Sequence, residues 1–389
     1  MYPTIYHLVS DLFGIEIPFL KIVQSFGFFV ALAFLSASWF FTVELKRKEK
    51  EALIGSNIQR VLQGEKATIL ELISSALFGF AIGYKLLYVV QNYHDFVGHA
   101  QQFILSANGS FLGGIIGAVI SGYLKYYEKN KERLPEPKWV EQKVHPYELV
   151  GNMTLIAAVS GILGAKIFHN LENLDAFLMD PMGELLSFSG LTMYGGLIFG
   201  SVSVIYYAVK NKINAWHLID ACAPGLMFAY AVGRIGCQVA GDGDWGIVNT
   251  APLPGYLSFL PHWMWAYNFP HNVNEVGVPI PGCTGDHCFM LPQPVFPAPF
   301  YETVMCLLLF VLLWSIRKKI KVPGVLFSVY LAFNGIERFL IEHIRVNTLY
   351  HIAGYGITQA QIISTLLFFI GLSGIFYLRK KHAIAGSNE

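Results

Sequence analysis

The sequence predicts an all-α polytopic membrane protein with about nine transmembrane helices, and with seven as the lower bound. Hydrophobic residues make up 54% of its 389 residues and charged residues only 14%, a balance that a water-soluble domain does not need for its core. The apolar residues gather in runs of roughly 18 to 25, and a helix of that length crosses a hydrocarbon layer of about 30 Å. Helices are expected because backbone polar groups in lipid must find their hydrogen-bond partners within the segment.

The predicted spans follow the apolar runs in order along the chain. They cover residues 22–41, 70–90, 109–127, 147–169, 191–209, 221–240, 300–316, 324–344 and 358–378. The first run lacks a basic leader and a small-residue cleavage site, so we interpret it as a retained span and not as a signal peptide.

Lysine and arginine alternate between the predicted loops. Basic residues follow the first, third, fifth and seventh spans and fill the C-terminal tail, whereas residues 91–108, 170–187 and 241–300 contain no lysine or arginine. Because cytoplasmic loops carry the excess of positive charge, this pattern places the N-terminus outside and the C-terminus in the cytoplasm. Residues 241–300 then form a 60-residue periplasmic loop.

An internal similarity suggests duplicated two-helix units within a single membrane domain that spans residues 1–389. Residues 69–120 and 146–205 both contain a Gly-x-Lys motif near the end of one apolar run and a Gly-Gly pair early in the next. Parallel repeats of this kind also occur in transporters, and chance similarity between glycine-rich helices is the alternative. The lysines of the motif, Lys85 and Lys166, are expected to snorkel to the interface.

The 60-residue loop at 241–300 is rich in Pro, Trp, Tyr and Phe, which suits an ordered flap at the boundary between lipid and water. Cys283 and Cys288 lie in it as Cys-x4-Cys, in a compartment that permits disulfides. A small structural disulfide is the favoured interpretation. Two free thiols, or a metal site that uses Asp286 and His287, are the alternatives.

The first cluster of membrane charges surrounds Arg234. Residues 233–246 read Gly-Arg-Ile-Gly-Cys-Gln-Val-Ala-Gly-Asp-Gly-Asp-Trp-Gly, so glycines permit close helix approach and then a tight turn that bears Asp242 and Asp244. A guanidinium held in the membrane costs free energy and offers a planar fork for a phosphate group. The alternative is an ion pair between Arg234 and one of the two aspartates that only fixes the turn.

The second cluster lies on the eighth predicted span. Arg338, Glu342 and Arg345 are spaced i, i+4 and i+7, so they share one helical face, on which the acid can bridge the two arginines. Glu337 points elsewhere. A row of ion-paired side chains on one helical face often has only a structural role. Two arginine clusters near the outer face of the membrane, however, suggest a site for an anionic lipid headgroup.

Five motifs in order resemble those of the prolipoprotein diacylglyceryl transferases. They are Asp-x3-Pro followed by Gly-Arg-Ile-Gly, Gly-Asp and Trp-Gly at 220–246; Tyr194-Gly195-Gly196 in place of the family's His-Gly-Gly; Pro299-Phe300-Tyr301-Glu302 in place of Gln-Leu-Tyr-Glu; Arg338-x3-Glu342-x2-Arg345; and Thr358-x2-Gln361-x2-Ser364. The resemblance covers residues 146–378 and a Phe-Gly pair at 26–27. The segment 53–127 has no counterpart in the shorter members.

The resemblance implies a reaction at the bacterial inner membrane. In the family, an sn-1,2-diacylglyceryl group moves from phosphatidylglycerol to the lipobox cysteine of a prolipoprotein signal peptide, which forms a thioether and releases glycerol phosphate. The implied catalytic residues are Tyr194, Arg234, Arg338, Glu342, Asp242 and Asp244. The implied substrate-binding residues are Arg234, Arg338, Arg345, Gly195, Gly196 and Glu302. The resemblance further implies a site that faces the outer leaflet, contact with membrane lipids, a monomer, and neither metal nor cofactor.

Departures from the family pattern fall on residues that the family is thought to use. Tyr194 stands for a histidine, Cys237 for an asparagine, Phe26 and Asn334 for tyrosines, and Asp242 or Asp244 for a glutamate. A phenol with a pKa near 10 is a poor base at neutral pH. The proton acceptor is therefore a Tyr194 whose pKa neighbouring arginines depress, one of the two aspartates, or a substrate oxygen.

A rival interpretation is a noncatalytic lipid-binding or transporter-like membrane protein, which also accounts for the repeat and the buried charges. Nucleic acid is not an expected partner, because the net charge of +1 is close to zero and no basic residues interleave with aromatics. A membrane protease is disfavoured because the sequence contains neither Gly-x-Ser-x-Gly nor His-Glu-x2-His.

Overall fold

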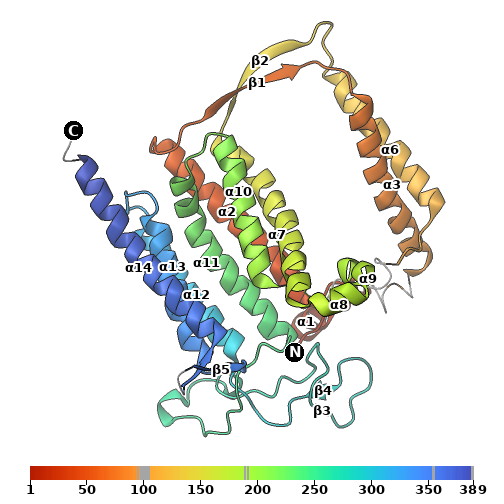
Figure 1. The fold of residues 1–389 in the computed structure, drawn as a ribbon. Helices are drawn as coiled ribbons and strands as arrows, with labels where there is room; N and C mark the ends of the chain where they lie inside the picture. The colour runs from red at the N-terminus through yellow and green to blue at the C-terminus, as the bar shows by residue number, and fades with distance from the viewer. Residues whose placement is uncertain (94–95, 97–105, 188–189, 191, 353–354, 387–389) are drawn as a thin grey trace. The chain divides into compact units, whose positions relative to one another are not determined.

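The computed structural model of the chain describes residues 1–93, 96, 106–187, 190, 192–352 and 355–386 (Figure 1). Within these residues a long helix lies at each predicted span. These helices are α2 (Ser25–Lys50), α3 (Ile69–Gln91), α6 (Phe111–Lys131), α7 (Val150–Glu172), α10 (Met193–Lys210), α11 (Ala215–Ala240), α12 (Ala298–Ile316), α13 (Val325–Glu342) and α14 (Gln359–Gly386).

Six segments of the described chain are long and apolar enough to cross a membrane. They are Ser25–Lys50, Ile69–Gln91, Pro146–Glu172, Ala215–Ala240, Ala298–Ile316 and Gln359–Ile384. The expectation of an all-α polytopic membrane protein is therefore confirmed. The count of nine spans and their orientation stay predictions.

Shorter elements connect the long helices. The helical ones are α1 (Ile5–Phe13), η1 (Pro18–Ile22), η2 (Pro146–Leu149), α8 (Leu174–Met179), α9 (Pro181–Leu186), η3 (Gly255–Leu257) and η4 (His262–Met264). The strands form three two-stranded sheets, β1 (Asn57–Gln63) with β2 (Lys138–Val144), β3 (Val278–Pro279) with β4 (Phe289–Met290), and β5 (Leu349–Ile352) with β6 (Tyr355–Thr358). The pairs β3–β4 and β5–β6 are antiparallel.

The chain divides into two compact units. The large unit comprises residues 1–3, 24–57 and 145–389, and the small unit comprises residues 4–23 and 58–144. The small unit contains the helix pair α3–α6, and the large unit contains the other long helices. Whether both act as one membrane domain, with duplicated helix pairs, stays a prediction.

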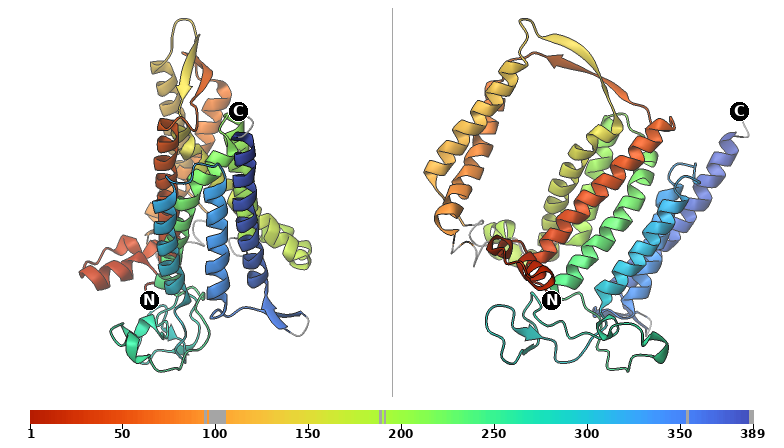
Figure 2. Two further views of the ribbon diagram at one scale, coloured as in Figure 1. Left: turned by 90° about the vertical axis from the view of Figure 1, so that its left-hand side faces the viewer. Right: turned by 180° about the vertical axis from the view of Figure 1, so that it is seen from behind.

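Close helix packing organises the large unit, in which α2 lies on α11, α7 on α10 and α13 on α14 (Figures 1 and 2). The α13–α14 crossing depends on glycine, because a Cβ at Gly335 would lie 2.6 Å from the Ser364 carbonyl oxygen. A Cβ at Gly371 would likewise lie 2.5 Å from the Ser328 carbonyl oxygen. The close crossing fixes the helix that carries Arg338.

The loop at 241–300 lies at the end of the large unit where α11 ends and α12 begins (Figure 2). Phe269, Leu291 and Val295 form a small apolar core within it. A disulfide joins Cys283 to Cys288 beside the β3–β4 pair, which confirms the favoured interpretation of these cysteines over free thiols or a metal site.

The start of α13 is fixed by a carboxylate from another helix. Asp220 of α11 accepts hydrogen bonds from the backbone amides of Gly324 and Phe327, both at 2.8 Å. The first amides of a helix have no partner within the helix, and Gly324 has no side chain with which to cap them. Lys48 of α2 lies 3.9 Å from the same carboxylate. Asp220 therefore connects three helices at one buried point.

We expect Asp220→Ala to lower the free energy of unfolding by about 3 kcal/mol, because it leaves two buried amides and the Lys48 ammonium without their acceptor. Thermal unfolding in detergent measures the effect, and Asp175→Ala, which removes an exposed carboxylate, is the control. An equal melting temperature for the two variants would contradict this role of Asp220.

Candidate active site

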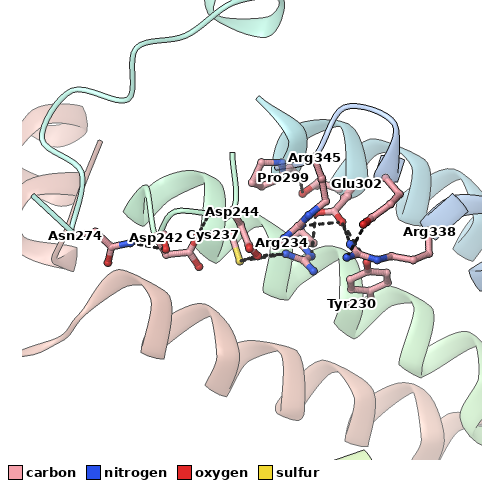
Figure 3. A network of polar contacts seen from close by, with 12 residues as sticks. Tyr230, Arg234, Cys237, Asp242, Asp244, Asn274, Pro299, Glu302, Arg338 and Arg345 are labelled. Atoms are coloured by element: carbon pink, nitrogen blue, oxygen red, sulfur yellow. Dashed lines mark hydrogen bonds and ion pairs between the residues drawn. The ribbon is translucent and has the colours of Figure 1, made fainter. Parts of the chain in front are cut away.

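Three arginine side chains converge where α11, α12 and the end of α13 meet (Figure 3). Arg234 lies in the last turns of α11, Arg338 lies in α13, and Arg345 lies just beyond the end of α13. The structure thus brings together the two arginine clusters that the sequence placed more than 100 residues apart.

Glu302 of α12 is the common partner of the three guanidinium groups. Its carboxylate lies 3.1 Å from Arg234 Nε, 3.1 Å from Arg338 Nη1 and 3.4 Å from Arg345 Nη1. Its side chain is fully buried. A buried carboxylate among three cations is stabilised by their charge and holds them at fixed positions. Glu302 therefore holds the three guanidinium groups in place, and its assignment to substrate binding stays a prediction.

Asp244 supplies the second shared carboxylate from the loop after α11. One oxygen forms an ion pair with Arg234 Nη1, and the other lies 2.6 Å from Arg345 Nη2. The backbone beside it is fixed by Gly246, whose amide donates to the Phe296 carbonyl oxygen at 2.8 Å. A Cβ at Gly246 would lie 2.5 Å from the Ile344 carbonyl oxygen, so only glycine permits this approach.

The expectation that Glu342 bridges Arg338 and Arg345 is wrong. Glu342 lies 3.1 Å from Arg338 Nη2, but α13 ends at Glu342, so Arg345 does not continue the helical face. Arg345 turns instead to Asp244 and Glu302. The other Glu342 oxygen accepts a hydrogen bond from Asn347 Nδ2. Glu342 consequently orients Arg338 alone.

Asp242 lies beside Asp244 but forms none of the described ion pairs. Burial raises the pKa of its carboxyl, and the nearby Asp244 carboxylate raises that pKa further. Burial acts on Asp244 in the same direction, but the charges of Arg234 and Arg345 outweigh it and lower the Asp244 pKa. The two aspartates of one turn therefore differ. The arginines hold Asp244 ionised, whereas the raised pKa makes Asp242 the more basic carboxylate of the two.

Cys237 lies beside this turn, with its sulfur 3.8 Å from both Arg234 Nη1 and an Asp244 oxygen. Ligand atoms of Cys237, Asp242 and Asp244 lie within 4.8 Å of one another, which is close enough to surround a cation. The Arg234 guanidinium already contacts two of these three groups, and its positive charge opposes a metal ion there. The guanidinium thus already neutralises part of the negative charge of this turn.

Tyr194, Gly195 and Gly196 lie at the start of α10, outside the arginine network. Among the interactions of the described residues, none joins Tyr194 to Arg234, Arg338 or Arg345. Gly195 has a packing role, because its Cβ would lie 2.3 Å from the Gly164 carbonyl oxygen on α7. The arginine network is therefore assembled without Tyr194 among the described interactions, and the roles predicted for Tyr194, Gly195 and Gly196 stay predictions.

Lys166, which the sequence predicted to snorkel, is buried instead, and its Nζ donates to Ser187 Oγ at 2.8 Å. Lys85 likewise donates to the Asn108 carbonyl oxygen at 2.8 Å. Both lysines therefore anchor the loop that follows their helix. Burial contradicts the snorkelling expectation for Lys166, whereas Lys85 is only half-buried and its snorkelling stays a prediction.

Sequence reasoning missed Tyr230, which lies one turn before Arg234 on α11. Its hydroxyl donates to Glu302 at 3.4 Å, and the Arg234 guanidinium lies over its ring at 5.3 Å from the centroid. The signal available in the sequence was the spacing of four residues between Tyr230 and Arg234, which places both side chains on one face of the helix. The tyrosine helps to fix both members of the central ion pair.

Comparison with known proteins identifies the family of the chain. The sequence model of the family described as prolipoprotein diacylglyceryl transferase matches residues 132–377. A relative from Dehalococcoides mccartyi is 26% identical over 244 residues, which are 62% of this chain and 82% of the relative. One from Oceanobacillus iheyensis is 26% identical over 68% of this chain and 81% of its own length. One from Corynebacterium diphtheriae is 28% identical over 60% and 78%.

All three relatives carry the name phosphatidylglycerol–prolipoprotein diacylglyceryl transferase. The segment matched by the family begins after Lys131, the last residue of α6, so it contains every residue of the arginine network. The chain belongs to the prolipoprotein diacylglyceryl transferase family.

Proposed function

We propose that this chain transfers a diacylglyceryl group from phosphatidylglycerol to the cysteine thiol of a prolipoprotein, as the names of its relatives state for them. The observation that carries the proposal is the convergence of Arg234, Arg338 and Arg345 around Glu302. Guanidinium groups form bidentate hydrogen bonds with phosphate oxygens, so three of them together suit the phosphodiester of a phospholipid. We further propose a site at the outer leaflet of the inner membrane and a monomeric enzyme.

The charge balance of the site determines how a phosphate enters it. Among the described residues, the three arginines form ion pairs with three carboxylates, those of Asp244, Glu302 and Glu342, so an incoming anion must displace one of them. The Glu302 and Glu342 side chains are 0% exposed and lie on helices, whereas the Asp244 side chain is 34% exposed and lies on a loop. Asp244 is thus the carboxylate that yields its place between Arg234 and Arg345 to the phosphate.

The reaction is a nucleophilic displacement at the carbon of the diacylglyceryl group that carries the phosphate oxygen. The thiolate sulfur forms a bond to this carbon while the bond from carbon to the phosphate oxygen breaks, and glycerol phosphate leaves with the electron pair. Negative charge grows on the leaving phosphate, so guanidinium groups held in advance by Glu302 stabilise the transition state more than the ground state.

Asp242 is our proposed acceptor of the thiol proton. It lies on the same turn as Asp244, beside the arginines but without an arginine partner among the described ion pairs. Burial raises its pKa above the ordinary aspartate value, which makes it a stronger base than an exposed carboxylate. Tyr194 lacks such a connection to the site.

The first test is mass spectrometry of a lipobox peptide incubated with the purified protein and phosphatidylglycerol in detergent. We expect a diacylglyceryl mass gain, and a rate at least about 100-fold lower for Arg234→Ala, since the leaving phosphate loses its guanidinium. Arg234→Lys keeps the charge without the fork and should give an intermediate rate. No mass gain with wild-type protein, where a relative is active, would favour noncatalytic lipid binding or transport.

A second prediction concerns Tyr194. We expect Tyr194→Phe to retain the transfer rate within about threefold, because the hydroxyl has no contact with the arginine network among the described residues. Tyr230→Phe is the matched comparison and should slow transfer more, because it removes a donor to Glu302. A 100-fold lower transfer rate for Tyr194→Phe would show that the Tyr194 hydroxyl takes part in the reaction.

A third prediction follows from the raised pKa of Asp242. Only the ionised carboxylate accepts a proton, so kcat/KM should rise with pH through the Asp242 pKa and reach a plateau above it. Asp242→Asn should abolish this limb and lower kcat by roughly 100-fold. Asp286→Asn, at an exposed position of the β3–β4 turn, is the control. If kcat/KM of Asp242→Asn rose with pH as in the wild type, a group other than Asp242 would be the base.

A further inference from the structure

Two helix pairs in this chain are built alike. In the pair α3–α6, a Cβ at Gly83 would lie 2.2 Å from the Gly113 carbonyl oxygen, and in α7–α10 a Cβ at Gly164 would lie 2.5 Å from that of Gly195. Both first helices are 23 residues long. The two crossings are therefore equivalent, with an offset of 81 residues between the first helices and 82 between the second.

Hydrogen bonds repeat with the same offset. Lys85 and Lys166 each donate to a serine that lies 21 residues later, Ser106 and Ser187. The residue before each second helix donates its amide to the first helix, from Ser110 to Tyr84 at 2.9 Å in one pair and from Thr192 to Ala165 at 3.1 Å in the other. The two helix pairs agree in their glycine crossing, in the lysine that anchors the loop and in the amide bond before the second helix, which supports two copies of one unit.

In the second copy, one face of the helix pair is filled by another helix. Met153 of α7 and Ala208 of α10 are buried in a cluster with Phe41 and Leu45 of α2. Thr154 of α7 also donates to Ser38 of α2 at 3.1 Å. The occupant of this face is thus an apolar helix that presents large side chains one turn apart.

The corresponding face of the first copy is an apolar groove. With the offsets of 81 and 82, Met153 corresponds to Leu72, and Ala208 corresponds to Tyr126. The groove is lined by Leu72, Ile73, Ala76, Gly122, Tyr123 and Tyr126. Ala76 and Gly122 leave room for a helix backbone, and no charged side chain lines the groove.

We propose that the α3–α6 groove binds the apolar signal-peptide helix of the substrate prolipoprotein. The inference rests on the proposed function, which supplies a substrate with an uncharged membrane-inserted segment. The second copy shows that the equivalent face accepts an apolar helix, and the uncharged lining suits the apolar core of a signal peptide. The groove is thus an interaction surface for the protein substrate, separate from the arginine site for lipid phosphate.

This surface adds to the machinery that the family shares, because α3 and α6 both precede the first matched residue, 132. A signal helix bound to α3–α6 stays within the membrane and next to the enzyme. Its cysteine is then present at a higher effective concentration for that enzyme molecule. The benefit should therefore appear in KM for the complete substrate and not in the chemical step.

The test fills the groove without disturbing the helix crossing. A Cβ at Gly122 would meet only the Ala76 Cβ, at 3.8 Å, so Gly122→Leu is compatible with the fold. We expect it to raise KM for a full-length prolipoprotein about tenfold and to leave KM for a short lipobox peptide without the apolar segment unchanged. Ala81→Leu adds the same bulk at an exposed position of α3 outside the groove and should change neither value.

Equal KM values for wild type and Gly122→Leu with the full-length substrate would overturn the proposal. A photocrosslinker in place of Tyr123 identifies the occupant directly, and we expect an adduct with the signal segment of the prolipoprotein. An adduct with a second copy of this chain, or with lipid alone, would also overturn it. Failure of wild-type protein to modify the short peptide is a different result, because it rejects the transferase function itself.

Discussion

The arrangement of the site depends on one buried carboxylate. Glu302 contacts three guanidinium groups that would otherwise repel one another, and it is fully shielded from solvent. Removing the negative charge would leave three cations in a region of low dielectric, so the crossings of α11, α12 and α13 are coupled to this single residue. The glycine contacts of α13 with α14 and the Asp220 cap support the same geometry from farther away.

The sequence predicted the helices and the arginines well because both signals are local. Apolar runs indicate spans, and a charge within a span is conspicuous wherever it occurs. The partners were harder to predict. Periodicity assigned Glu342 to two arginines, but the helix ends at that residue, and Arg345 turns to a loop carboxylate that lies 101 residues earlier. Such a contact depends on where a helix stops, which single-sequence patterns locate poorly.

Similar reasoning explains Lys166 and Tyr194. A lysine near a helix end usually reaches water, yet a folded loop supplies Lys166 with a serine hydroxyl inside the protein. Tyr194 was assigned by alignment with a histidine, whereas its surroundings contain no arginine contact among the described residues. The position of Tyr194 in a motif therefore does not by itself assign its role, and its part in catalysis stays a prediction.

The sequence distance between ion-pair partners has a consequence for biogenesis. Glu302 of α12 pairs with Arg234 of the preceding helix and with Arg338 and Arg345, which lie 36 and 43 positions later, so the complete set of its ion pairs needs all three helices. During synthesis α11 enters the membrane with Arg234 before α12 brings Glu302, and α12 enters before α13 brings Arg338. The Arg234 guanidinium therefore carries an electrostatic cost in the membrane until α12 supplies its carboxylate, and a chain truncated between α12 and α13 lacks two of the three arginine partners of Glu302.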